Sequence, residues 1–194
     1  MNFSLTKKKK KKMKDKHTPK YYKRKYRGFP ISDNVRNCFL SGMYYCYKDV
    51  NRSDGWEAVQ LDIKYGSKKL YHRVYFPLER EGESVHKFNK RFSEAKCMME
   101  RVMAAFLNRD TRAKINRDTY EGGVFDYFRE FQKIYLKNEL FTVPLVIKVI
   151  RNSSGFISLP RYGEFIRQDD ENGENFSYTE YEKKILEKYD FLQS

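Results

Sequence analysis

The sequence is poor in the residues that build disulfide frameworks and metal sites. It contains three cysteines, Cys38, Cys46 and Cys97, an odd number without the spacing of metal ligands. Its three histidines form no pair at a four-residue interval, and none accompanies a cysteine pair. This pattern argues against a disulfide framework and a zinc site and favours a reducing compartment. We therefore expect no metal and no cofactor.

Long apolar runs are also missing. The most apolar stretch, 141–150, includes Pro144 and Lys148, and it is too short to cross a bilayer. The lysines near the N-terminus precede no apolar segment, so a secretory signal is not expected. Phosphate-binding glycine motifs and the serine-hydrolase nucleophile motif are absent as well. We expect an intracellular protein that is not secreted and has no membrane segment.

Positive charge is what the sequence has in excess, and its distribution is uneven. The 194 residues include 40 lysines and arginines against 26 acids, a formal net charge of +14. Thirteen of the basic residues lie within 1–27, beside a single acid, whereas 168–194 holds eight acids and three lysines. We predict a disordered basic tail (1–28), a folded domain (29–167) and an acidic C-terminal segment (168–194) with a helix. The basic excess predicts a polyanionic partner.

Alternating apolar and polar residues predict three consecutive β-strands. The first, 38–48, is rich in tyrosine and phenylalanine, and the next two, 56–65 and 68–77, alternate regularly. Asp54-Gly55 and Gly66-Ser67 are turn signals between them. Short turns between adjacent strands predict an antiparallel meander.

Helical periodicity follows the meander. It predicts a helix from Val85 to Leu107 with Ser84 as its N-cap, a basic loop over 109–117, and a second helix from Val124 to Leu140. Two further strands are expected at 143–150 and 156–159, followed by an edge segment at 162–166 and a closing helix at 178–189. This order predicts a β-rich α+β fold, an OB-like five-stranded antiparallel barrel with a two-helix insert at about 84–140. A mixed α+β sheet with helices on one face is the alternative.

The outward face of the third strand carries the most informative residues. Tyr71, Arg73 and Tyr75 place two aromatic rings beside a guanidinium where a solvent face usually carries small polar or charged residues. Bases stack on aromatic rings, and basic side chains neutralise phosphates, so the pattern predicts a surface for single strands. The alternative is that helices cover this face. The other predicted nucleic-acid-binding residues are Tyr45, Tyr47, Trp56, Lys64, Lys68, Lys69, Arg109, Arg112 and Lys114.

One short motif suggests a different chemistry. Asp62-Ile63-Lys64 has the D-x-K spacing of metal-dependent nucleases, in which the acid binds Mg²⁺ and the lysine assists the attacking water. Such a site also needs an upstream acid, for which Asp49, Asp54 and Glu57 are the candidates. Because this spacing is common by chance, we expect a protein that is not an enzyme and keep the nuclease as a lesser alternative.

Several segments together resemble the phage-type single-stranded DNA-binding proteins. They are residues 40–45, the turn that ends in Ser53-Asp54-Gly55, and residues 59–63. Two apolar segments, 146–150 and 156–159, look like a closing hairpin, and residues 161–165 follow it. The resemblance implies an OB fold that coats single-stranded DNA, or RNA, with little sequence preference during DNA replication or recombination. It also implies the cytoplasm of an infected host cell. The sequence leaves open whether replication proteins contact the acidic segment and whether the protein forms oligomers.

A structural alternative remains open. A protein that packages nucleic acid, or a virion protein, would draw nearly all its affinity from the basic tail, and its folded body would assemble with further copies. Such a protein would show no preference for single strands over duplex.

Overall fold

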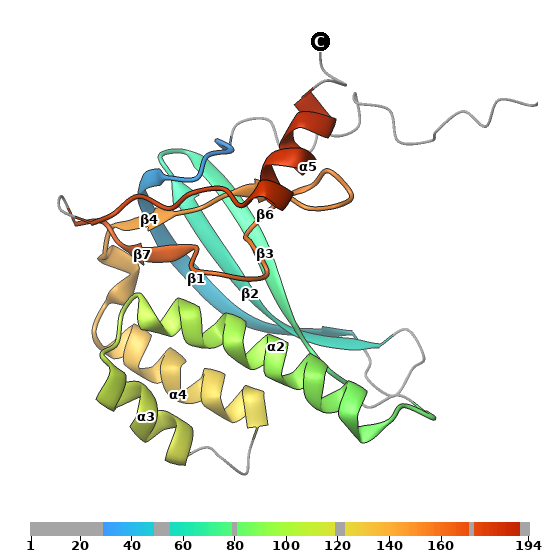
Figure 1. Ribbon diagram of the computed structural model, residues 1–194. Coiled ribbons are helices and arrows are strands. Elements are labelled where there is room, and N and C mark those ends of the chain that lie inside the picture. The colour runs from blue at the N-terminus through green and yellow to red at the C-terminus, as the bar shows by residue number, and fades with distance from the viewer. Residues whose placement is uncertain (1–28, 49–54, 79–80, 119–122, 171–172, 191–194) are drawn as a thin grey trace, which may run out of the picture.

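The computed structural model describes residues 29–48, 55–78, 81–118, 123–170 and 173–190. Five antiparallel strands form one sheet in the order β3-β2-β1-β4-β7 (Figure 1). They are β1 (Val35–Lys48), β2 (Trp56–Tyr65), β3 (Lys68–Phe76), β4 (Leu145–Ile147) and β7 (Ile166–Gln168). The predicted basic tail, 1–28, lies outside the described residues.

The first three strands form the predicted meander. β2 pairs with β3 in continuous register from Glu57 opposite Phe76 to Tyr65 opposite Lys68. Gly66 adopts a φ of 55° in the connecting turn, a conformation that glycine reaches without steric cost. β1 is less regular, because its pairing with β2 shifts between Leu40 and Gly42. That bulge changes which residues of β1 face each side of the sheet.

Three helices lie together on one side of this sheet (Figure 1). They are α2 (Val85–Ala104), α3 (Arg109–Asp118) and α4 (Gly123–Lys137). Ser84 caps α2 as predicted, since its side chain accepts a hydrogen bond from the Lys87 backbone N–H. The core between helices and sheet is apolar and almost solvent-free; its members include Met99, Val102, Met103, Phe128 and Phe131 from the helices and Leu40, Leu61, Ile63 and Leu70 from the strands.

The sheet is open, so the predicted barrel closure is wrong. Closure would pair the two edge strands, but β3 and β7 stand at opposite ends of the strand order. The helical segment packs over the apolar face instead and buries it without closure. The observed architecture is thus an α+β sheet with its helices on one face.

The basic loop expected over 109–117 is also wrong, because these residues form α3. The Thr111 backbone N–H donates to Asn108 Oδ1 at 2.9 Å, which caps the first turn. Ile115 is buried in the core and anchors this otherwise charged helix.

The strand expected over 143–150 is divided. Its first part is β4, and its last residue begins β5 (Ile150–Arg151), which pairs with β6 (Ile157–Ser158) in a separate two-stranded sheet. A short 3₁₀ helix, η1 (Leu140–Thr142), precedes β4, and α5 (Glu180–Asp190) ends the described chain.

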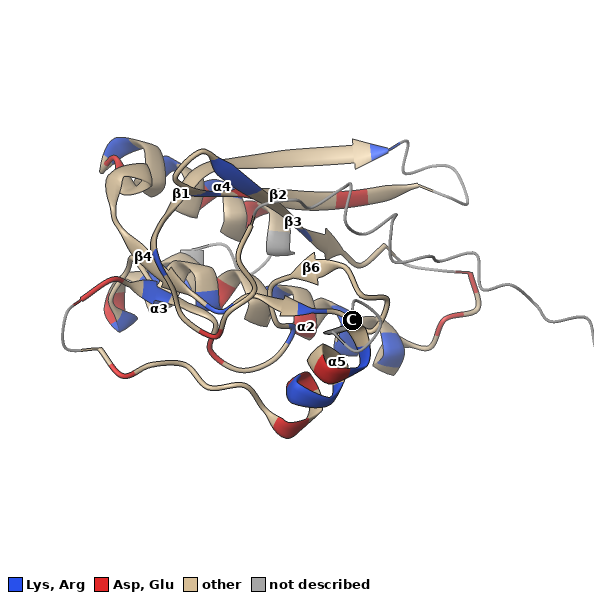
Figure 2. Cartoon of the chain, turned by 90° about the horizontal axis from the view of Figure 1, so that it is seen from above, with Lys and Arg blue, Asp and Glu red and all other residues tan. Residues whose placement is uncertain are grey.

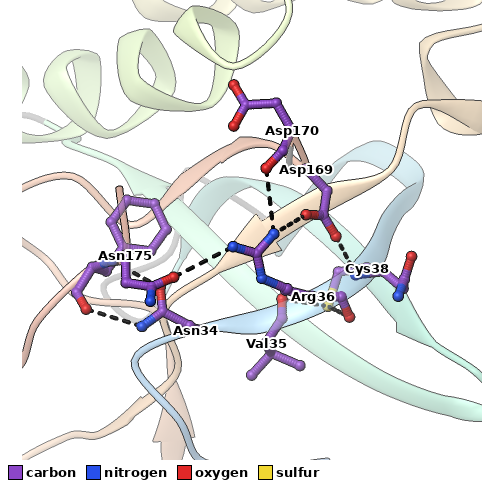
Figure 3. Close-up of polar contacts among 9 residues, drawn as sticks. Asn34, Val35, Arg36, Cys38, Asp169, Asp170 and Asn175 are labelled. Atoms are coloured by element: carbon purple, nitrogen blue, oxygen red, sulfur yellow. Dashed lines mark hydrogen bonds and ion pairs between the residues drawn. The ribbon is translucent and has the colours of Figure 1, made fainter. Parts of the chain in front are cut away.

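The acidic segment is attached to the sheet through a polar cluster at the start of β1 (Figure 3). An Arg36 guanidinium nitrogen lies 2.6 Å from Asp169 Oδ1, and the Asn37 backbone N–H donates to Asp169 Oδ2 at 2.9 Å. Asn34 and the backbone of Phe176 exchange two further hydrogen bonds, of 3.0 and 2.7 Å. Among the described residues of the segment, Asp169 and Phe176 therefore attach it to the start of β1.

A buried ion pair attaches α5 to the same domain. Lys148 Nζ lies 2.6 Å from Glu182 Oε2, and both side chains are almost fully buried. Lys148 also donates to the Ser177 carbonyl oxygen at 2.8 Å. Glu182 accepts from the Thr179 backbone N–H and donates its own N–H to Thr179 Oγ1, a capping box at the start of α5. Basic and acidic residues both occur along α5 (Figure 2), so this helix is not uniformly acidic.

Candidate nucleic-acid interface

The two faces of the β1–β3 meander differ in what lies on them. The face toward the helices contributes the core, for example Leu61 and Val74. The opposite face carries aromatic, basic and amide side chains, and we call it the open face. Its side chains are Phe39, Tyr44, Cys46, Lys48, Trp56, Ala58, Gln60, Asp62, Lys64, Lys69, Tyr71, Arg73 and Tyr75. Helices α2 to α4 pack on the other side of the sheet (Figure 1).

Three tyrosines of the open face present large areas of ring to solvent. Tyr44 is 52% exposed, Tyr71 is 55% exposed and Tyr75 is 54% exposed. They come from β1 and β3, which flank β2. Exposed rings on one face of a sheet can stack several successive bases of single-stranded nucleic acid.

Trp56, Tyr75 and Arg73 form a cluster at one end of the open face. The Trp56 and Tyr75 ring centroids are 5.6 Å apart at an interplanar angle of 79°. The Arg73 guanidinium lies 5.1 Å from the Trp56 centroid. A cation over an indole is electrostatically favourable, and the contact holds the guanidinium at the level of the rings. Base stacking and phosphate neutralisation are thereby available at one place.

A hydrogen-bonded chain crosses the centre of the same face. Arg73 Nε donates to Gln60 Oε1 at 3.1 Å, and Gln60 Nε2 donates to Asp62 Oδ1 at 2.9 Å. The two bonds orient the Gln60 amide, because its oxygen meets a donor and its nitrogen meets an acceptor. Polar groups in fixed positions thus lie among the exposed rings.

The structure brings together half of the residues predicted from the sequence. Six of the twelve lie on the open face: Trp56, Lys64, Lys69, Tyr71, Arg73 and Tyr75. The alternation predicted for β2 and β3 is confirmed, and no described helix covers Tyr71 or Tyr75.

Three predicted residues, Tyr45, Tyr47 and Lys68, lie on the opposite face. The Tyr45 ring packs edge-on against Phe125 of α4, with centroids 4.7 Å apart. Burial, with a smaller contribution from a hydrogen bond to Glu57, raises the pKa of Tyr45 to about 12. Tyr45 and Tyr47 lie on this face because the bulge between Leu40 and Gly42 adds one residue to β1, which reverses the faces of all the residues after it.

The other three predicted residues, Arg109, Arg112 and Lys114, belong to α3 in the helical layer. Arg112 Nε donates to the Leu107 carbonyl oxygen at 3.3 Å, which stabilises the connection between α2 and α3. The sheet separates these residues from the open face, so they do not join the residues gathered there.

Sequence reasoning missed two aromatic residues of the open face, Tyr44 and Phe39. Tyr44 lies opposite Gln60, and Phe39 lies opposite Lys64, which is an outward-facing position of β2. The available signal was Gly42: a glycine within a strand often marks a bulge, after which the alternation changes phase.

A nuclease site needs its acids and its lysine on one face, but the motif and its described candidate acid lie on opposite faces of the sheet. Asp62 and Lys64 share the open face, whereas Glu57 lies on the helix side beside Tyr45. The other candidate acids, Asp49 and Asp54, lie outside the described residues. Within the described part of the chain, no three His, Cys, Asp or Glu side chains are grouped to hold a metal ion.

The inward-facing histidine of β3 contacts the small second sheet. His72 Nδ1 lies 3.4 Å from Ser158 Oγ of β6. Burial lowers the pKa of His72 to about 4, because the charged imidazolium would lose its hydration there. His72 is therefore neutral at pH 7 and belongs to the packing of the domain rather than to the open face.

Among the described residues, no helix has the length and apolarity needed to span a bilayer. Comparisons with protein-family models, with curated proteins and with solved structures found no match.

Proposed function

We propose that this protein binds single-stranded nucleic acid, DNA in the first instance, through the open face. The observation that carries the proposal is the exposure of Tyr44, Tyr71 and Tyr75 on one face of a sheet whose other face holds the helices. Each base stacked on such a ring contributes about 1–3 kcal/mol. Duplex DNA keeps its bases stacked on one another, so a platform of rings selects unpaired strands.

The basic side chains of the face supply the second part of the affinity. Lys64, Lys69 and Arg73 lie among the rings and can neutralise phosphates of a strand whose bases are stacked there. Neutralised phosphates release counterions, so binding weakens as salt rises. Because every base has a π-face, most positions on this surface accept any base. On this proposal the protein is not an enzyme, and it coats single strands during phage DNA replication or recombination inside the host cell.

The experiment uses the single tryptophan, Trp56, which lies on the open face. Titration with oligo-dT should quench its fluorescence, and raising the salt from about 50 to 200 mM should weaken binding by an order of magnitude or more. A duplex of the same length serves as the control and should bind more weakly. The proposal would be overturned if the protein did not bind oligo-dT, or if its affinity did not change with salt concentration.

A packaging or virion role is the second candidate, favoured by the thirteen basic residues within 1–27. A chain lacking residues 1–27 separates the two. If the open face binds, the shortened chain keeps much of its affinity and its preference for single strands. If the protein packages nucleic acid through its tail, the shortened chain loses nearly all affinity, and the full chain binds duplex equally well.

A further inference from the structure

The open face carries one carboxylate among its described residues, that of Asp62. A carboxylate repels phosphates, so its presence between Lys64 and Arg73 is unfavourable for a surface that only neutralises a backbone. It becomes favourable where a ligand offers hydrogen-bond donors. The bases of a single strand carry such donors on their Watson–Crick edges, whereas the backbone phosphates carry none.

The carboxylate of Asp62 is held in place. Gln60 Nε2 donates to Asp62 Oδ1, and Gln60 itself is oriented by its bond from Arg73 Nε. An ionised carboxylate has about four acceptor positions, and the bond from Gln60 uses one of them. Both oxygens of Asp62 therefore retain the capacity to accept further hydrogen bonds from a ligand at a defined place on the sheet.

An exposed ring lies next to this carboxylate. Asp62 is directly opposite Tyr71 in the β2–β3 pairing, and Tyr71 is 55% exposed. Directly opposed residues of antiparallel strands have Cβ atoms about 5 Å apart. A base stacked on Tyr71 therefore has its edge within reach of Asp62. The pairing joins a stacking position to a hydrogen-bond acceptor, the combination by which proteins read unpaired bases.

The chemistry of the acceptor selects among the bases. The Watson–Crick edge of guanine presents two adjacent donors, N1–H and the N2 amino group, which match the two oxygens of a carboxylate. Adenine and cytosine each present one amino donor beside a ring nitrogen acceptor. Thymine and uracil present one N–H between two carbonyl oxygens that a carboxylate repels. An acceptor-only side chain thus favours guanine and disfavours thymine.

We infer that Asp62 makes the Tyr71 position of the open face selective for guanine. This inference rests on the proposed function and adds one selective position to a surface that is otherwise tolerant of sequence. Gln60 is a positioning residue, because it acts by orienting Asp62.

The test compares a thymidine hexamer with the same hexamer carrying one central guanine, using fluorescence of Trp56 in the full-length protein. A good bidentate pair discriminates by about 5- to 150-fold, so we expect the guanine oligomer to bind about tenfold more tightly. Replacing guanine by hypoxanthine, which lacks the N2 amino group, should remove most of that gain. Hexamers with one cytosine or one adenine should fall between the two extremes.

The Asp62→Asn variant tests the residue. Its side-chain oxygen can still accept from Gln60, so the hydrogen-bonded chain is kept, but its amide group presents donors toward the donors of guanine. The ratio of guanine to thymine affinities should fall to about one. Glu164→Gln removes an equal charge from an exposed residue between β6 and β7 and should leave that ratio unchanged.

The outcomes are distinct. If no oligomer binds, the proposed function itself fails. If all oligomers bind equally, or if Asp62→Asn keeps the guanine preference, binding by the open face survives and the assignment of Asp62 is wrong. A preference for cytosine or adenine over guanine also overturns it, because the edge of the base then contacts another group.

Discussion

The ring of Tyr44 lies over Gly42 on the open face. A Cβ atom added at residue 42 would be 2.4 Å from Tyr44 Oη and 2.6 Å from Tyr44 Cε2. The absence of a side chain at Gly42 therefore lets the ring lie along the strand, where 52% of Tyr44 remains exposed. The glycine is needed here for space, because a neighbouring ring occupies the position of its missing side chain.

We predict that Gly42→Ala weakens binding to oligo-dT about as much as Tyr44→Ala does. The added methyl group displaces the ring, which is free to move toward solvent, so the cost to folding is small. Loss of one stacked base corresponds to about 1–3 kcal/mol of binding free energy. Fluorescence titration gives the affinity, and thermal unfolding should give a nearly unchanged Tm. Normal binding by Gly42→Ala beside weak binding by Tyr44→Ala would contradict the prediction.

The assignment of faces makes a second prediction. Tyr71→Ala and Tyr75→Ala should each weaken binding to oligo-dT by about five- to 150-fold, since each removes an exposed ring from the open face. Tyr47→Ala is the matched control: Tyr47 is on the helix side of the same sheet and is 68% exposed. The three affinities are compared under one salt condition. Equal losses in all three variants would mean that the face of the sheet does not decide binding.

The sequence predicted β2 and β3 well because one face of each is buried and a shift of one residue would expose every core side chain. The observed β2 has the predicted bounds, and β3 differs by one residue at its end. The same alternation placed Tyr71 and Tyr75 on the face opposite the core, but it left open whether helices cover that face; their exposure is a finding of the structure.

Local alternation did not predict which face of the sheet each β1 side chain occupies, or that the sheet stays open. The bulge between Leu40 and Gly42 is a feature of pairing with β2, and local alternation does not contain it. Whether β3 and β7 meet depends on how the helices fill the apolar face, which is a long-range property. α3 was missed because it is mostly charged, and only its inward residues, such as Ile115, bury apolar surface.

The buried ion pair makes a third prediction, on stability. Lys148→Met leaves the Glu182 carboxylate buried without its cation, and Glu182→Gln leaves the Lys148 ammonium without its anion. Breaking one partner of such a pair costs about 3–5 kcal/mol, whereas replacing both costs much less. Urea unfolding of the two single variants and of the double variant measures this coupling. Additive losses in the double variant would show that the two charges do not stabilise each other.

The last prediction concerns pH and His72. In the unfolded chain the imidazole has a pKa of 6.5, and burial lowers the pKa of His72 to about 4 in the folded protein. Between these values the unfolded state binds more protons, so the free energy of unfolding rises with pH from about 4 to 6.5 and falls as the pH is lowered. The full shift corresponds to about 3 kcal/mol.

The comparison is with His72→Gln, which cannot take up a proton but keeps a polar group near Ser158. Carboxylates also titrate below pH 5, so the informative quantity is the difference between wild type and variant in urea unfolding at each pH. That difference should be constant above pH 7 and should shift in favour of the variant as the pH falls toward 4. A pH-independent difference would mean that His72 is protonated with little penalty in the folded state, and that its imidazole is not desolvated against β6.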